Sequence, residues 1–118
     1  MSEKAIQSDI MLRIGGRKDV RLFRNNVGEA KAADGRYIIY GLCPGSGDLI
    51  GWQSITITPD MVGQRFARFL SVEVKGPRGT VRPDQQNWLE QVHAAGGIAI
   101  VARSADAVQD KLAEGEGL

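Results

Sequence analysis

The stretch FLSVEVKGPRG, residues 69–79, decides the fold because it reads as a strand with a defined end. Glu73 and Lys75 alternate with valines, and this period of two places both charged residues on the same side of the strand. Apolar residues occur on both sides, which indicates that both sides are covered. Pro77 cannot donate to a strand ladder, so the strand stops at Gly76. A carboxylate and an ammonium on a covered side are costly unless they are paired or bound to an ion.

The rest of the chain alternates between helical and strand patterns around this stretch. Apolar periodicity, capping residues and glycine or proline turns set the predicted bounds. They give the order α-β-β-β-β-α-β-α, which favours an α/β fold with a mixed central sheet flanked by helices on both sides. At 118 residues, we expect one domain over residues 1–118. The predicted elements are a helix over 2–14, strands over 19–25, 35–42, 48–58 and 65–75, a helix over 83–95, a strand over 98–102, and a final helix capped by Ser104.

Composition excludes several classes of protein. No apolar run approaches the roughly 20 residues that span a bilayer, so no membrane association is expected. Cys43 is the only cysteine, which excludes an intramolecular disulfide and fits a reducing, cytoplasmic compartment. The net charge of +1 does not indicate a nucleic-acid partner. Basic residues nevertheless concentrate in residues 13–36 and 61–82, so the folded chain has either one basic face or scattered charges.

Three further residues are candidate partners for Glu73 and Lys75. Asp48 follows a glycine-rich turn and directly precedes an apolar strand; a turn-capping aspartate is the structural alternative. Gln85 lies on the apolar face of its helix. The structural alternative is that it caps the end of a sheet by hydrogen bonding, as a glutamine on a core-facing side of a helix usually does. Glu3 lies in the first turn of the first helix, a position that the helix dipole favours by itself. Asp and Glu oxygens are natural Mg²⁺ ligands, so a metal site and a plain Glu–Lys ion pair both remain open.

With Asp48, Glu73-Val74-Lys75 and Gln85 in this order, the chain resembles the PD-(D/E)xK nuclease superfamily. More narrowly, it is similar to the small stand-alone VRR-NUC (virus-type replication-repair nuclease) domains of phages and bacteria. This resemblance implies a restriction-endonuclease-like core and Mg²⁺- or Mn²⁺-dependent hydrolysis of DNA phosphodiesters. It covers nearly the whole chain, through the first helix with Glu3 and Gln7, RLFRNNVG, GLCPGSGDLIG, VEVKGPRG and DQQNWLEQVHAAGG.

The resemblance also implies a role for each matching residue. Gly47 replaces the proline that gives the superfamily its name, a change that concerns the turn rather than the chemistry. The implied roles are metal ligation by Asp48, Glu73 and the Val74 carbonyl, positioning of water by Lys75, completion of the acidic cluster by Glu3, support of the site by Gln85, and DNA contacts by Arg24 and Asn25. Arg78, just beyond the proline that ends the strand, is a further candidate phosphate contact by its position.

Similarity to junction resolvases further implies a homodimer acting on branched DNA, because a two-fold dimer matches a two-fold junction. Partners such as a helicase are not readable from the sequence. The alternative is a non-catalytic DNA-binding or assembly module that keeps the nuclease fold. A hydrolase of another class is a third interpretation, but His93, the only histidine, is expected on an outer helix face.

Overall fold

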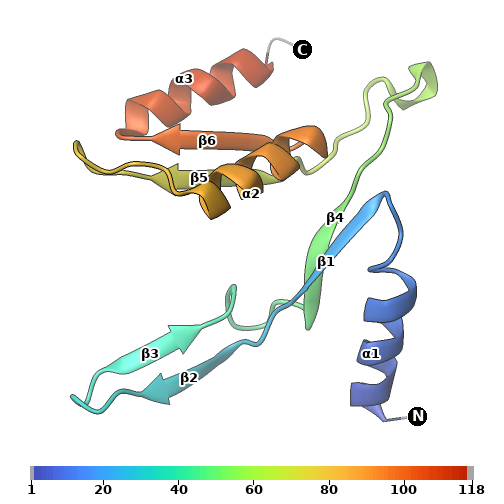
Figure 1. Ribbon diagram of the computed structural model, residues 1–118. Helices are drawn as coiled ribbons and strands as arrows, with labels where there is room; N and C mark the ends of the chain where they lie inside the picture. The colour runs from blue at the N-terminus through green and yellow to red at the C-terminus, as the bar shows by residue number, and fades with distance from the viewer. Residues whose placement is uncertain (1, 117–118) are drawn as a thin grey trace. The chain divides into compact units, whose positions relative to one another are not determined.

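The computed structural model of the chain describes residues 2–116 (Figure 1). They form two compact units that divide between Ser54 and Ile55, each with its own helices and strands. The first unit contains α1 (Glu3–Arg13), β1 (Val20–Arg24), β2 (Gly28–Lys31), β3 (Tyr37–Tyr40) and β4 (Leu49–Gln53). The second unit contains a 3-10 turn, η1 (Pro59–Met61), then β5 (Leu70–Val74), α2 (Pro83–Ala94), β6 (Ile98–Ala102) and α3 (Ala105–Glu116).

In the first unit, α1 begins where the sequence predicts. The Ser2 hydroxyl accepts a hydrogen bond from the Ala5 backbone N–H at 3.1 Å and so caps the helix. The helix ends at Arg13, two residues before the pair of glycines at positions 15 and 16. The predicted helix over residues 2–14 is therefore confirmed.

Strands β1 and β4 form an antiparallel pair with Val20 opposite Gln53. Gly51 lies so close to β1 that a Cβ on it would meet the Arg21 carbonyl oxygen at 1.8 Å, which explains the glycine inside a strand. The predicted strand over residues 48–58 is too long. Because β1 begins at Val20, the residues after Gln53 have no further strand opposite them in this pair.

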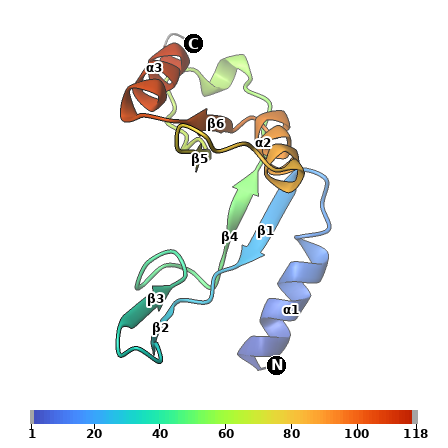
Figure 2. The ribbon, with the colours of Figure 1, turned by 60° about the vertical axis from the view of Figure 1, so that its left-hand side comes forward.

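Strands β2 and β3 form a second antiparallel pair, an extended hairpin (Figure 2). Its turn is closed by the Ala32 N–H donating to the Arg36 carbonyl at 2.8 Å, with Gly35 at a φ of +89°. The sequence predicts β3 but not β2. Glycine, glutamate, alanine and lysine are poor strand formers, so β2 is a strand because it pairs with β3.

The second unit is built on β5 and β6, which pair in parallel from Leu70 opposite Ile98 to Val74 opposite Ala102. Parallel strands require a crossover connection, and α2 supplies it. The buried apolar residues all come from α2 and β6: Leu89, Val92, Ile100 and Ala102. The predicted helix over 83–95, the strand over 98–102 and the Ser104 cap of α3 are confirmed. The strand predicted over 65–75 is shorter, because β6 offers only five partners.

The fold is therefore mixed α/β, with three helices and small sheets. The order contains one strand more than predicted, namely β2. Within the described residues, the strands pair as three two-stranded sheets, so the predicted single central sheet is not confirmed. In the same part of the chain, no helix is both long enough and apolar enough to cross a membrane.

Candidate active site

One side of β5 is packed against α2 through aromatic and polar contacts. The rings of Phe69 and Trp88 meet edge to face, with centroids 6.3 Å apart and planes at 75°. The Trp88 indole N–H donates to the Ser71 hydroxyl at 2.8 Å. Because side chains alternate along a strand, the side of β5 that carries Phe69 and Ser71 also carries Glu73 and Lys75. This confirms the prediction that Glu73 and Lys75 share a side and that this side is covered. The opposite side carries Leu70 and Val74, which are exposed, so the prediction that both sides are covered is not confirmed.

Gln85 of α2 connects the two charged residues of β5. Its Nε2 donates to Glu73 Oε1 at 2.8 Å, and its Oε1 accepts from Lys75 Nζ at 2.8 Å. The same Oε1 accepts from the Arg82 backbone N–H at 3.0 Å, which secures the first turn of α2. Lys75 Nζ also lies 3.3 Å from Glu73 Oε1. Every polar atom of the Gln85 amide group is thus used to hold the pair or the start of the helix.

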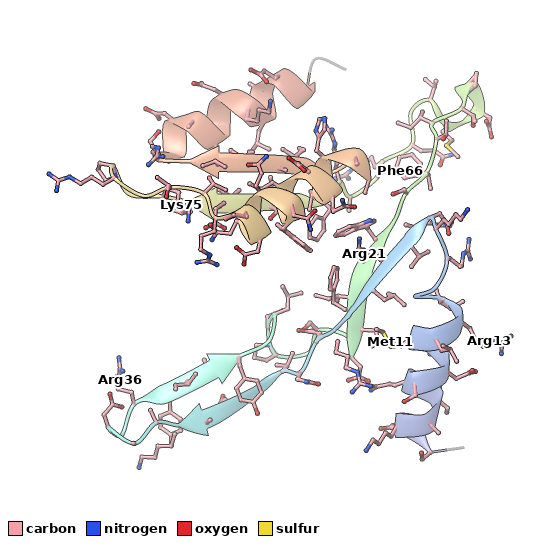
Figure 3. The ribbon with its side chains drawn as sticks, in the orientation of Figure 1. Met11, Arg13, Arg21, Arg36, Phe66 and Lys75 are labelled. Carbon is pink, nitrogen blue, oxygen red and sulfur yellow. The ribbon has the colours of Figure 1, made fainter. Side chains whose placement is uncertain are left out.

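The pair is partly withdrawn from water, since 13% of the Lys75 side chain and 29% of the Glu73 side chain are exposed. Figure 3 labels the Lys75 side chain, directly after β5. Burying opposite charges is tolerated when they are paired and their remaining hydrogen-bonding groups are satisfied. Lys75 has three N–H donors; one donates to Gln85, and the ammonium as a whole forms the ion pair with Glu73. Glu73 uses Oε1 alone, and its Oε2 has no hydrogen-bond partner among residues 2–116. At least one ammonium donor and one carboxylate oxygen are therefore available for a ligand.

The loop after β5 is held by a residue that the sequence did not single out. Arg103, just beyond β6, donates from Nη2 to the Gly79 carbonyl at 2.8 Å and from Nη1 to the Gly76 carbonyl. Arg78, between these glycines, is exposed and forms no ion pair or side-chain hydrogen bond within the described part of the chain. Arg103 became identifiable only through the parallel pairing, which brings the ends of β5 and β6 together.

Arg82, at the start of α2, adds positive charge to this region. It is paired with Asp84, with Nε 3.2 Å from Oδ1. The hydrogen bond from Arg82 lowers the pKa of the Asp84 carboxyl, and the bond to Asp84 raises the pKa of Arg82. The Glu73 charge raises the pKa of Arg82 further by a smaller amount. Both members of this exposed pair therefore stay charged at neutral pH.

The first unit carries the other predicted site residues. Asp48 directly precedes β4 and is exposed to solvent. Its backbone carbonyl accepts from the Asn25 N–H at 2.9 Å, which places it at the end of the β1–β4 pair. Arg24 is exposed at the end of β1, and Glu3 is exposed in the first turn of α1.

Asn25 is buried, with 8% of the residue exposed. Its Nδ2 donates to the Ser46 hydroxyl at 2.7 Å and to the Gly47 carbonyl at 2.9 Å, and its Oδ1 accepts from the Leu42 N–H at 2.9 Å. The sequence pattern pointed to a phosphate contact for this residue and gave no sign of these bonds. The predicted phosphate contact stays a prediction.

The structure thus brings together Glu73, Lys75 and Gln85 in the second unit, and Asn25 with the Asp48 backbone in the first. Within residues 2–116, no three His, Cys, Asp or Glu side chains are grouped so as to hold a metal ion. The atoms that could bind a metal ion are nevertheless hard oxygen ligands, from carboxylates and from the Val74 carbonyl. Mg²⁺ and Mn²⁺ prefer such ligands, so the residue types fit these ions.

Comparison with known families adds one finding. The family model described as VRR-NUC domain matches residues 1–106. Searches of curated proteins and of solved structures gave no significant match.

We predict that Gln85→Leu destabilises the fold, because it removes the amide that joins Glu73 and Lys75. The expected loss is roughly 1–3 kcal/mol in the free energy of unfolding, measured by urea denaturation. Gln86→Leu is the matched control, since the only side-chain hydrogen bond of Gln86 within residues 2–116 is to Glu90 on the exposed face of α2. It should change stability by less than about 0.5 kcal/mol. Equal losses in the two variants would contradict a special role for Gln85.

Proposed function

The chain belongs to the VRR-NUC domain family, and from this premise we propose that it is a Mg²⁺- or Mn²⁺-dependent DNA endonuclease. Membership itself places the chain among nuclease domains that process DNA. The observation that carries the finer proposal is the Glu73–Lys75 pair, which Gln85 holds on a half-buried strand face. The pair leaves Glu73 Oε2 and at least one Lys75 N–H without a partner among residues 2–116, and a hydrolytic site needs both groups.

The proposed ligands of the metal are Asp48, Glu73 and the Val74 carbonyl, with Glu3 completing the acidic cluster. The bound ion would supply positive charge that stabilises the negative charge developing on the phosphate. Glu73 suits ligation through Oε2, because Gln85 and Lys75 already fix Oε1.

Lys75 is the proposed catalytic residue. Hydrolysis forms a bond from the water oxygen to phosphorus and breaks one phosphorus–oxygen ester bond; the attacking water gives up a proton to solvent, and the departing oxygen takes one up from solvent. An N–H of Lys75 that is not bonded to Gln85 can donate to the attacking water or to a non-bridging phosphate oxygen, since the bond to Gln85 and the ion pair with Glu73 hold the ammonium in place. Gln85 acts here as a positioning residue. Arg78, on its tethered loop, and Arg24 are proposed phosphate contacts.

We predict that Lys75→Ala and Asp48→Asn each reduce the single-turnover rate of DNA cleavage by at least about 100-fold, as expected when a group that stabilises the transition state is lost. The assay uses four-way junction, flap, duplex and single-stranded DNA, each with EDTA, Mg²⁺ or Mn²⁺. Lys111→Ala is the control, because Lys111 pairs only with Glu114 on the exposed surface of α3.

Cleavage at the parent rate by either site variant would remove that residue from the proposed site. Binding of DNA without cleavage of any substrate, with metal present, would favour the non-catalytic DNA-binding module instead.

We also propose that the substrate is branched DNA and that the active species is a homodimer, because a two-fold pair of active sites matches a two-fold junction. Sedimentation at micromolar concentration should give about twice the 12.8 kDa mass of the chain. A monomer that cuts duplex and junction DNA equally well would overturn both parts of this refinement.

A further inference from the structure

The loop that precedes β4, residues 42–48, is fastened at both ends by one side chain. The Oδ1 atom of Asn25 accepts from the N–H of Leu42 at its start, while Nδ2 donates to Ser46 and Gly47 at its end. The Asn25 backbone N–H adds a bond to the Asp48 carbonyl at 2.9 Å. Four hydrogen bonds that involve a single residue therefore fix the position of the loop and of Asp48 at the start of β4.

Asn25 suits this task better than the phosphate contact that its sequence position implies. Both Nδ2 hydrogens are donated within the loop, so neither is free for a phosphate oxygen. Asn25 is also buried, whereas its neighbour Arg24 is exposed and extends no side-chain bond within the described residues. Among residues 2–116, Asn25 is the one polar or charged residue that is buried. A buried amide is stable only when its donors and acceptor are hydrogen-bonded.

The loop combines a local turn with two glycines of positive φ. Pro44 and the bond from the Ser46 N–H to the Cys43 carbonyl, at 3.1 Å, restrict residues 43–46. Gly45 at a φ of +86°, and Gly41 at +85° just before the loop, are the positions with the most backbone freedom, so the bonds of Asn25 add order on either side of the turn. Ser46 reinforces one turn by donating to the Cys43 carbonyl at 2.6 Å. A Cβ at position 41 would lie 2.6 Å from the Asn26 carbonyl oxygen and from the Val27 Cα, so the chain enters the loop in close contact with the segment that follows Asn25.

We propose that Asn25 is a positioning residue that fixes the Asp48 carboxylate for metal binding, not a DNA contact. This inference rests on the proposed function in so far as Asp48 is a metal ligand. Residues that orient a ligand without touching the metal typically change its affinity by roughly 10–100-fold when they are removed.

The test compares Asn25→Ala with Asn26→Ala, an adjacent and exposed asparagine that forms no side-chain hydrogen bond within residues 2–116. Calorimetry should show Mn²⁺ affinity at least about tenfold weaker for Asn25→Ala and unchanged for Asn26→Ala. DNA affinity without metal should stay within about twofold of the parent for both. In an Asp48→Asn background, adding Asn25→Ala should not weaken Mn²⁺ binding further, because both act through the same ligand.

Ser46→Ala is a milder variant that removes one acceptor of the Asn25 amide, in case Asn25→Ala does not fold. It should weaken Mn²⁺ binding in the same direction by a smaller factor. A loss of metal-free DNA affinity in Asn25→Ala, with Mn²⁺ affinity intact, would overturn the inference and restore the phosphate contact.

Amide hydrogen exchange separates this inference from the proposed function. The Leu42 N–H should lose protection in Asn25→Ala, whether or not the parent binds metal. Unchanged protection of Leu42 overturns the positioning role. A parent that binds no Mn²⁺ overturns Asp48 as a ligand, while lost Leu42 protection still supports Asn25 as the residue that orders the loop.

Discussion

The amide of Gln85 lies between the Glu73 carboxylate and the Lys75 ammonium, and the proposed catalytic role of this pair depends on that arrangement. The amide nitrogen faces Glu73, and the amide oxygen faces Lys75 and the Arg82 N–H. A reversed amide would point its oxygen at the carboxylate and its N–H groups at the ammonium, so the charges determine its orientation. The result is a partly buried ion pair in which the Gln85 amide fixes the positions of the Glu73 carboxylate and the Lys75 ammonium.

Both units use the same physical device to fix a loop next to a proposed site residue. Arg103 holds the carbonyls of Gly76 and Gly79 after Lys75, and Asn25 holds residues 42–48 before Asp48. In each case, a side chain from a neighbouring strand end binds backbone groups that a glycine-rich loop would otherwise leave to water. Loops supply chemistry, and such anchors give them the order that chemistry needs.

The sequence was sufficient for features governed by local periodicity. Alternation placed Glu73 and Lys75 on one side of β5, and helical spacing placed Gln85 on the face of α2 that meets them. It was insufficient where partners determine the outcome. Strand β2 has little strand propensity and exists through β3, and the lengths of β4 and β5 are set by the strands that pair with them. The side-chain bonds of Asn25 join residues 17 to 22 positions apart, a separation that no local pattern reports.

The central claim is that the Lys75 ammonium, held by Gln85 and Glu73, takes part in phosphodiester hydrolysis. The most direct measurement is chemical rescue of Lys75→Cys in a Cys43→Ser background, which leaves one thiol in the chain. Alkylation of that thiol with bromoethylamine restores an ammonium at nearly the original distance from the backbone. The account predicts that the untreated variant does not cleave DNA and that the alkylated variant regains metal-dependent cleavage. Cleavage by the untreated variant at the rate of its Cys43→Ser parent would contradict it.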